Sequence, residues 1–443
     1  MSVPLKALRA YLHQPDGSRR PFAHLVSYGD VMRVAFDEDY IADPARPVLS
    51  FAYRDLDDHV SQQLMRNQRS DRIARLDGHW PAYFMNVLPE GHNRSRLALA
   101  RGCSEEDEFE LLAGSGRDLM GALEVEPVTQ PASLPDTILH WHLAANLALN
   151  PEPVAEPVED AASLPGVVIK FSAIRDGRRY TVRHRGQAGS YILKLPTSLH
   201  PDLVENEFTG FRLCTALGLD CAEATIVSSA DVDVSEHVPF ERVLSVKRFD
   251  RLDVVDADGA VSNRRVHFEE LCQALNRPPM KKYTKDLRDY AAMLGMLQAL
   301  SDRRARDLED FVGRFVAFIL MGNCDAHLKN WGFIYPDGRR PRLAPVYDPV
   351  CVAAMFRSDD PRHLSHNRAA DDAMRAIDEQ GLETVLRQAG LPSSLRARLM
   401  RHARDTVLQA RARWPGILAD APASVQDTVL ARLDGGTSLS TLW

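Results

Sequence analysis

Four polar side chains that can carry out acid–base or metal chemistry lie in one short stretch, GNCDAHLKN at 322–330: Asp325, His327, Lys329 and Asn330. A second carboxylate, Asp348, follows just past a turn. Carboxylate and amide oxygens suit Mg²⁺, which binds one or two carboxylates and completes its shell with phosphate oxygens and water. The stretch is therefore a candidate site for metal-assisted chemistry on a phosphate.

The elements around this stretch are expected to bring Asp348 beside it. The preceding run DFVGRFVAFILMG has apolar residues at helical spacing and predicts a buried helix that ends near Gly322. After the loop, WGFIY predicts a strand, PDGRR a turn and RLAPVYD a returning strand. A hairpin folded at this turn brings Asn330 opposite about Val346, so that Asp348 lies next to the loop.

The spacing from Asp325 to Asn330 is D-x-x-x-x-N, which is also the spacing of the protein-kinase catalytic loop. In that loop the Asp receives the proton of the substrate hydroxyl and the Asn holds a metal ion, while a later Asp carries the metal that bridges the phosphates. The spacing alone favours the alternative of a polar turn capped by Asp and Asn. In that case His327 and Lys329 are surface loop residues.

A lysine on an apolar strand supplies the second half of the argument. SYILKLP places Lys194 in a strand, where an unpaired buried ammonium would be costly, and Glu207 in the next helix is a candidate partner. Strand lysine, helix glutamate and nucleotide phosphate form the clamp that kinases use. The alternative is an edge-strand lysine that points to water. Both halves occur in the chain order that a kinase requires, and this agreement favours the clamp.

The chain is too long for one ordinary core, and its pattern predicts three parts. Residues 1–128 predict a small α+β N-terminal subdomain, and 129–443 a core with a β-rich nucleotide-binding lobe at about 163–255 and a helical catalytic lobe at 256–443. The segment 151–166 is rich in Pro, Glu and Ala and predicts a linker or mobile loop. A β-rich lobe followed by a larger helical lobe predicts a cleft between them.

Composition excludes several other classes of protein. The net charge of -7 argues against binding nucleic acid through overall charge. Six cysteines without a CxxC pair indicate neither a zinc ribbon nor a disulfide framework. No apolar run reaches the length of a membrane span, and no signal-peptide h-region is found. We therefore expect a cytoplasmic protein without membrane contact.

The motifs together resemble the HipA family of bacterial serine/threonine kinases, the toxins of HipB–HipA toxin–antitoxin modules. The resemblance runs nearly end to end. It rests on VLPEG and GRDLMGALEVEP in the N-terminal part, and in the core on SLPGVVIKFSA, YILKLP, ENEF, KRFDR, HFEELCQAL, GNCDAHLKNWGF and LAPVYD. It implies an α+β, two-lobed protein-kinase-like fold with a small α+β N-terminal subdomain and a mostly helical C-terminal lobe.

The resemblance also implies roles for individual residues. Asp325 is the catalytic base, and Asn330 and Asp348 are Mg²⁺ ligands. Lys194 binds the ATP phosphates and Glu207 orients it. The strand before Phe249 is the adenine hinge, and Gln273 lies near the nucleotide phosphates. The complete set of nucleotide-binding residues is Lys194, Glu207, Lys170, Gly166, Phe249, Gln273, His327 and Lys329.

Ser163 matches the serine of a flexible phosphate-binding loop whose autophosphorylation switches family members off. A dianion there is expected to pull the loop out of the site by charge repulsion. The alternative is an ordinary capping serine in a polar linker. The family loop commonly reads Gly-x-Gln-Pro/Glu-Lys, whereas this chain has GVVIK at 166–170. Phosphate binding there is left to backbone N–H groups and Lys170.

The resulting hypothesis is an ATP- and Mg²⁺-dependent serine/threonine protein kinase that acts as the toxin of a toxin–antitoxin module. The resemblance suggests a translation component such as an aminoacyl-tRNA synthetase as the substrate. It suggests a small helix-turn-helix, HipB-like antitoxin as the partner, through which DNA is contacted only indirectly. The main alternative is a non-catalytic nucleotide-binding co-repressor of that antitoxin. A phosphoinositide or small-molecule kinase is a third interpretation.

Overall fold

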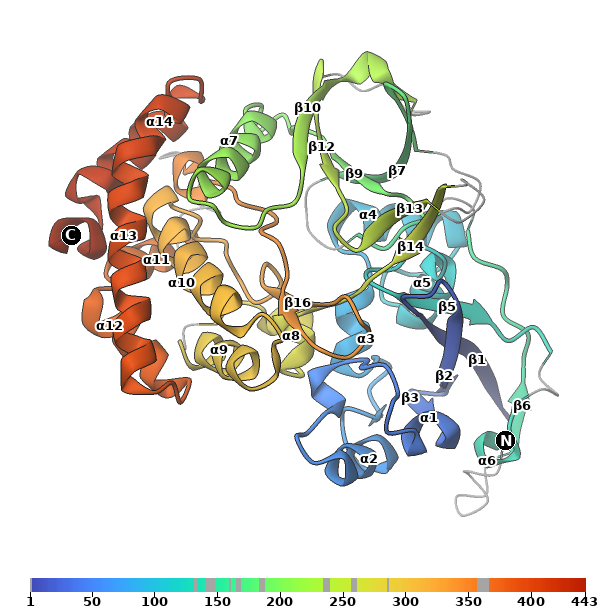
Figure 1. Cartoon of the computed structure of the whole chain (residues 1–443). Helices are drawn as coiled ribbons and strands as arrows, with labels where there is room; N and C mark the ends of the chain where they lie inside the picture. Colours follow the sequence, from blue (N-terminus) through green and yellow to red (C-terminus); the bar gives the residue numbers. More distant parts are fainter. Residues whose placement is uncertain are drawn as a thin grey trace.

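The computed structural model describes most of the chain. The described residues are 2–130, 134–139, 148–158, 161–164, 169–182, 188–233, 240–255, 261–284, 287–356 and 366–443. Figure 1 shows the N-terminal unit (residues 2–128) in blue and cyan beside a green sheet, with the orange and red helices on the far side. The termini lie at opposite sides of the molecule (Figure 1).

The N-terminal unit is built on a sheet in the order β4-β3-β2-β1-β5, with β6 paired to β1. Helices close one face over a core that includes the buried Trp80 and Phe84. The strands are β1 (Ser2–His13), β2 (Arg19–Tyr28), β3 (Val31–Phe36), β4 (Ala74–Arg75), β5 (Leu123–Pro127) and β6 (Ala148–Pro151). The helices are α1 (Glu38–Ala42), α2 (Asp58–Arg66), α3 (Ala82–Val87), α4 (Gly91–Arg101) and α5 (Glu108–Ser115), with α6 (Asp136–Leu139) following the unit.

The segment predicted to be a linker is not a free spacer where the structure describes it. β6 runs parallel to β1, Val154 is buried in the N-terminal core, and the amide of Val158 donates to the carbonyl of Gly114 at 3.0 Å. Its Pro- and Glu-rich composition led to the wrong interpretation, because two valines and a few backbone bonds suffice to attach it.

The sheet lobe (residues 169–265) has strands in the order β10-β12-β9-β7-β8-β11. Helix α7 (Leu203–Ala216) packs against β10 and β12 on one side and against α10 and α13 of the helical lobe on the other. A β13–β14 hairpin extends from the lobe. The strands are β7 (Lys170–Asp176), β8 (Arg179–Thr181), β9 (Tyr191–Lys194), β10 (Ala224–Ser228), β11 (Val232–Asp233), β12 (Arg242–Lys247), β13 (Arg251–Val255) and β14 (Val261–Arg265).

The helical lobe (residues 266–443) is centred on α10 (Arg304–Met321), which is buried from Phe311 to its end. The predicted buried helix is thus confirmed, and it stops at Gly322, whose φ of 77° suits glycine. Among the helices that the structure describes, none is long and apolar enough to cross a membrane. The other helices are α8 (Leu271–Ala274), α9 (Arg288–Leu300), α11 (His366–Arg375), α12 (Glu379–Gln388), α13 (Ser393–Leu418), α14 (Ala423–Ala431) and α15 (Ser438–Leu442).

A small sheet places the functional loop at the end of α10. Its three strands are β15 (His267–Glu270), β16 (Gly332–Tyr335) and β17 (Arg342–Leu343). Phe333 pairs with Leu343, and the Ala344 amide donates to the Gly332 carbonyl at 3.0 Å, so the predicted hairpin forms. The pairing ends before Asn330, because the Val346 amide donates to the carbonyl of Asp220. Asp348 still lies beside the loop, since Asn323 Nδ2 donates to its carbonyl at 3.3 Å.

Candidate active site

A cavity of about 420 Å³ brings together most of the predicted site residues. The sheet lobe contributes Phe249 and charged side chains that include Lys170, Lys194 and Glu207, and the helical lobe contributes the functional loop and Asp348. The predicted residues on its wall are Lys170, Lys194, Glu207, Phe249, Asp325, His327, Lys329, Asn330 and Asp348. The four side chains on which the sequence argument depends, those of residues 194, 325, 330 and 348, thus share one wall.

Lys194 and Glu207 form a buried ion pair, with 2.5 Å between Lys194 Nζ and Glu207 Oε1. Lys194 also pairs with Asp348. β9 lies between β12 and β7, so the alternative of an edge lysine in water is wrong. Burial alone would lower the pKa of Lys194, but Asp348 and Glu207 raise it above its usual value. The ammonium is therefore fixed and charged at the cavity wall.

A second ammonium, that of Lys170, faces the same carboxylate. Lys170 is the cross-strand partner of Lys194, and its Nζ lies 3.8 Å from Asp348 Oδ2. Burial lowers the pKa of Lys170, and the Asp348 charge opposes that shift. Lys170 and Lys194 thus face two carboxylates, those of Glu207 and Asp348. A phosphate would bind here by taking over part of the pairing with Asp348.

The loop after α10 is held by hydrogen bonds from three side chains. Asn330 Nδ2 donates to the carbonyl of Asp325 at 3.0 Å, and the Tyr347 hydroxyl donates to the carbonyl of Lys329 at 2.9 Å. The Tyr283 hydroxyl donates to Asp325 Oδ1 at 2.8 Å. These bonds fix the spacing of the Asp325 carboxylate and the Asn330 amide.

Asp348 itself has a left-handed backbone, with a φ of 52°. This conformation is costly for a non-glycine residue and persists only where surrounding structure enforces it. The next residue, Pro349, lies directly against Gly210 of α7, where any Cβ would overlap the Pro349 carbonyl oxygen. The glycine lets the helix that carries Glu207 approach the Asp348 segment.

The donor set around the cavity fits a magnesium–nucleotide unit. Asn330 has its amide nitrogen bonded to the loop, which turns its oxygen the other way, and Asp348 supplies a carboxylate. Within the described part of the chain, no group of three His, Cys, Asp or Glu residues is arranged to hold a metal. Mg²⁺ at this site would therefore take its remaining ligands from phosphate and water, as it usually does.

Two of the predicted nucleotide-binding residues on the wall, His327 and Lys329, offer no uncompensated positive charge to a phosphate. Burial, together with the nearby charges of Lys282 and Lys329, lowers the pKa of His327 to about 3, so its ring is neutral at pH 7. Lys329 Nζ lies 2.7 Å from Glu90 and 3.2 Å from Glu270, and it donates to the Asn86 carbonyl at 3.2 Å. The Lys329 ammonium is therefore enclosed by two carboxylates and one carbonyl.

Two further predicted residues, Gln273 and Ser163, are not among the residues that line the cavity. Gln273 caps the start of α8 and donates to the carbonyl of Tyr83 at 3.2 Å. Ser163 is fully buried, and its hydroxyl donates to the carbonyl of Val87 in the N-terminal unit. Gly166 lies outside the described residues. The predicted phosphate contact of Gln273 therefore has no support in its surroundings.

Sequence reasoning missed two residues that reach the site from other segments. Glu90 comes from VLPEG in the N-terminal unit, and Tyr283 from KKY before α9; both line the cavity. The chain has only eight lysines, and Lys282 beside Tyr283 is one of them. That rarity was a usable signal for the KKY segment. Nothing in the sequence indicated that Glu90 would meet a loop 239 positions away.

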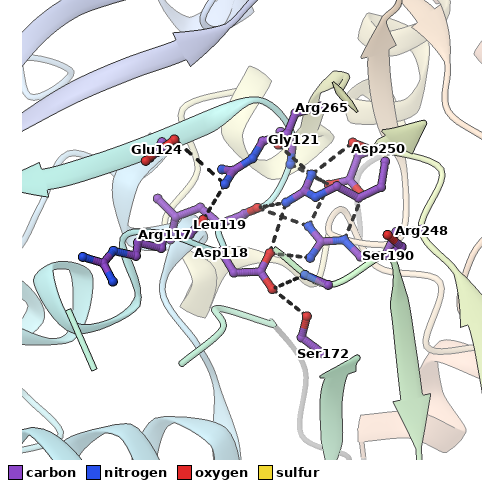
Figure 2. A network of polar contacts seen from close by, with 12 residues as sticks. Arg117, Asp118, Leu119, Gly121, Glu124, Ser172, Ser190, Arg248, Asp250 and Arg265 are labelled. Atoms are coloured by element: carbon purple, nitrogen blue, oxygen red, sulfur yellow. Dashed lines mark hydrogen bonds and ion pairs between the residues drawn. The ribbon is translucent and has the colours of Figure 1, made fainter. Parts of the chain in front are cut away.

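A buried charge network (Asp118, Arg248, Asp250 and Arg251) ties the N-terminal unit to the end of β12, the predicted hinge strand (Figure 2). Asp118 pairs with Arg248 at 2.7 Å and with Arg251 at 3.1 Å, and it also accepts from Ser172 of β7 at 2.5 Å. Burial would raise the pKa of Asp118, but the two guanidinium groups hold it well below its usual range. The N-terminal unit thus anchors two strands next to the cavity.

Comparison with known proteins identifies the family. The family model of the HipA-like C-terminal domain matches residues 162–414, more than half of the chain, and that of the HipA N-terminal domain matches residues 18–126. This chain belongs to the HipA family. The kinase-like protein Y4dM of Sinorhizobium fredii is 32% identical over 408 residues, which cover 89% of each chain. The serine/threonine-protein kinase toxin HipA of Shewanella oneidensis is 30% identical over 288 residues, 61% of this chain and 62% of that protein.

The fold agrees with the family. The structure of Shewanella oneidensis HipA, solved with HipB and operator DNA, superposes with a TM-score of 0.63 over 98% of this chain and 97% of that chain, at 21% identity. The predicted α+β, two-lobed kinase-like fold of the HipA type is therefore confirmed. Both relatives carry kinase names, which places this HipA-family chain among kinase homologues.

Proposed function

We propose that this HipA-family chain is an ATP- and Mg²⁺-dependent serine/threonine protein kinase and the toxin of a HipBA-type module. The observation that carries the proposal is the shared cavity wall, on which the two lobes place Lys170, Lys194, Glu207, Asp325, Asn330 and Asp348. Kinase catalysis consists mainly of positioning and charge stabilisation, and these are the groups that it uses. The kinase name of the Shewanella oneidensis relative supports the same activity.

In the proposed mechanism, the adenine lies near Phe249 at the end of β12, and the phosphates lie against Lys170 and Lys194. Lys194 keeps Glu207 as its partner and exchanges part of its pairing with Asp348 for phosphate oxygen. Asp325 accepts the proton of the acceptor hydroxyl. Mg²⁺, held with the nucleotide by Asn330 and Asp348, would neutralise charge on the transferring phosphoryl group.

The proposed partner is a small HipB-like antitoxin, because the superposed HipA was solved with HipB and operator DNA. DNA contact would then come through the antitoxin, as the acidic charge of this chain requires. The proposed substrate class is a translation component such as an aminoacyl-tRNA synthetase, in a cytoplasmic setting. Phosphorylation of Ser163 is part of the proposal and requires this buried side chain to leave Val87 first.

The direct test is phosphoryl transfer from labelled ATP with Mg²⁺, by the purified protein alone and in a lysate of its host. We expect Asp325→Asn to reduce transfer by about 10²–10⁴-fold while nucleotide binding persists, because it removes only the base. The matched control is Asp405→Asn, which makes the same change at an exposed aspartate of α13 and should keep full activity. A folded, ATP-binding wild-type protein that labels neither itself nor any lysate protein would overturn the proposal. If that inactive protein still binds the antitoxin, the alternative of a non-catalytic co-repressor is favoured.

A further inference from the structure

The N-terminal unit contributes one carboxylate to the wall of the candidate active site. Glu90 lies between α3 and α4 and lines the cavity. Glu90 Oε1 is 2.7 Å from Lys329 Nζ, and Glu90 Oε2 is 3.3 Å from Lys282 Nζ. The Lys329 side chain is 3% exposed, so its pair with Glu90 is shielded from solvent screening.

Lys329 lies on the loop between the two proposed functional residues, immediately before Asn330 and four residues after Asp325. Two of its three partners, the Glu90 carboxylate in an ion pair and the Asn86 carbonyl in a hydrogen bond, belong to the N-terminal unit. The third partner, Glu270, is paired with it from the end of β15. The position of the loop therefore depends on a unit that lies outside the two kinase lobes.

Charge balance in this cluster favours an ionised Glu90. Its pKa would be raised by burial but is lowered to about 2 by Lys329 and Lys282. Burial raises the pKa of Glu270 to about 7, against the opposing effect of Lys329. Near neutral pH, Glu90 is thus the fully charged partner of Lys329. Carboxylates whose pKa values are pushed apart in this way are typical of functional sites.

We propose that Glu90 is a positioning residue: through Lys329 it holds Asp325 and Asn330 in their working arrangement, so that the N-terminal unit is part of the catalytic apparatus. This inference rests on the proposed kinase function. Glu90 neither accepts the substrate proton nor needs to touch the nucleotide. Its effect is expected on the transfer step and not on nucleotide affinity.

The first test is Glu90→Gln, which keeps the shape of the side chain and removes its charge. We expect kcat to fall about 10- to 100-fold, with the KM for ATP within twofold of wild type and an unchanged circular dichroism spectrum. Asp37→Asn is the matched control, because Asp37 is also a carboxylate of the N-terminal unit in an ion pair, with Arg9, but does not line the cavity. Its kcat should stay within twofold. A Glu90→Gln protein with wild-type kcat would overturn the inference.

A double-mutant cycle decides whether Glu90 acts through Lys329. If it does, Glu90→Gln reduces activity no further when Lys329→Gln is already present. Additive losses would show an independent role and refute the inference. The conservative variant Lys329→Arg keeps a positive charge and should retain more activity than Lys329→Gln.

Hydrogen exchange gives a readout that does not need kinase activity. Amides of residues 323–330 should exchange several-fold faster in Glu90→Gln than in wild type, whereas amides of α13 should be unchanged. If the loop exchanges faster in Glu90→Gln but the wild-type protein transfers no phosphoryl group, the anchoring is supported and the proposed function is refuted. Unchanged loop exchange would refute the anchoring, whatever the activity.

Discussion

The Tyr283 hydroxyl donates a hydrogen bond to the proposed catalytic base, with 2.8 Å between Tyr283 Oη and Asp325 Oδ1. The tyrosine ring also packs edge-on against His327, with ring centroids 5.2 Å apart. A general base must lie about 2.6–3.2 Å from the hydroxyl that it deprotonates. Tyr283 therefore stands where the acceptor hydroxyl of a substrate is expected.

Tyr283→Phe should increase transfer to an added protein substrate, because the substrate no longer displaces an internal hydrogen bond. A hydrogen bond to a charged group contributes about 1.5 kcal/mol, so kcat/KM for the substrate should rise by up to about tenfold. Steady-state kinetics at saturating ATP measures this change. A fall in kcat/KM would instead mean that Tyr283 supports the base.

Asp118→Ala should destabilise the protein strongly, since it leaves Arg248 and Arg251 buried without one of their shared carboxylates. Breaking a buried pair costs about 3–5 kcal/mol. The free energy of unfolding in urea measures the loss, and the KM for ATP should rise because β12 loses its anchor. Glu38→Ala removes the exposed pair with Arg66 and should change stability by less than about 1 kcal/mol. Equal losses of unfolding free energy in Asp118→Ala and Glu38→Ala would contradict the structural role assigned to Asp118.

Gly210→Ala should weaken nucleotide binding, although Gly210 does not line the cavity. The added methyl overlaps the Pro349 carbonyl and must push the Asp348 segment away from α7. Overpacking of this kind costs about 1–3 kcal/mol. Calorimetry with ATP and Mg²⁺ should show reduced affinity. Gly416→Ala on α13 meets no atom within 4 Å and should leave both affinity and stability intact.

Glu269 makes stability depend on pH. It is fully buried, and burial raises its pKa from 4.5 to about 7, despite hydrogen bonds from Ser50, Tyr335 and Phe51. The folded state therefore holds a proton that the unfolded state has released, so this group loses stability as the pH rises from about 4.5 to 7. Relative to Glu269→Gln, wild type should lose on the order of 3 kcal/mol across that window. Urea unfolding at several pH values gives the free energy of unfolding against pH for both proteins. Parallel curves would contradict the raised pKa of Glu269.

Local chemistry in the sequence was sufficient for several features. The turn residues in PDGRR fixed the hairpin register, and the cost of burying Lys194 unpaired pointed to Glu207. Chain-distant contacts were not predictable in this way. The pair of Glu90 with Lys329 depends on how the N-terminal unit docks, which no local pattern encodes.

One error has a physical cause. The segment 151–166 was predicted to be a linker or mobile loop from its composition, yet Val154 is buried in the N-terminal core and the Val158 amide donates to Gly114. Tertiary contacts of this kind are not encoded in composition. The expected place of Gln273 near phosphate stays a prediction, although its side chain takes part in the cap of α8. The domain boundaries at 128 and 255 stay predictions.

The enclosure of Ser163 has a consequence for timing. Its hydroxyl bonds Val87 and its amide bonds the carbonyl of Asp118, both within the N-terminal unit. A kinase can reach this oxygen only after the segment has detached, so the rate of modification would follow the opening frequency and become independent of ATP at high concentration. A phosphorylated side chain is too large and too charged to return to a fully buried site. Detachment followed by phosphorylation would therefore be a one-way event until a phosphatase acts.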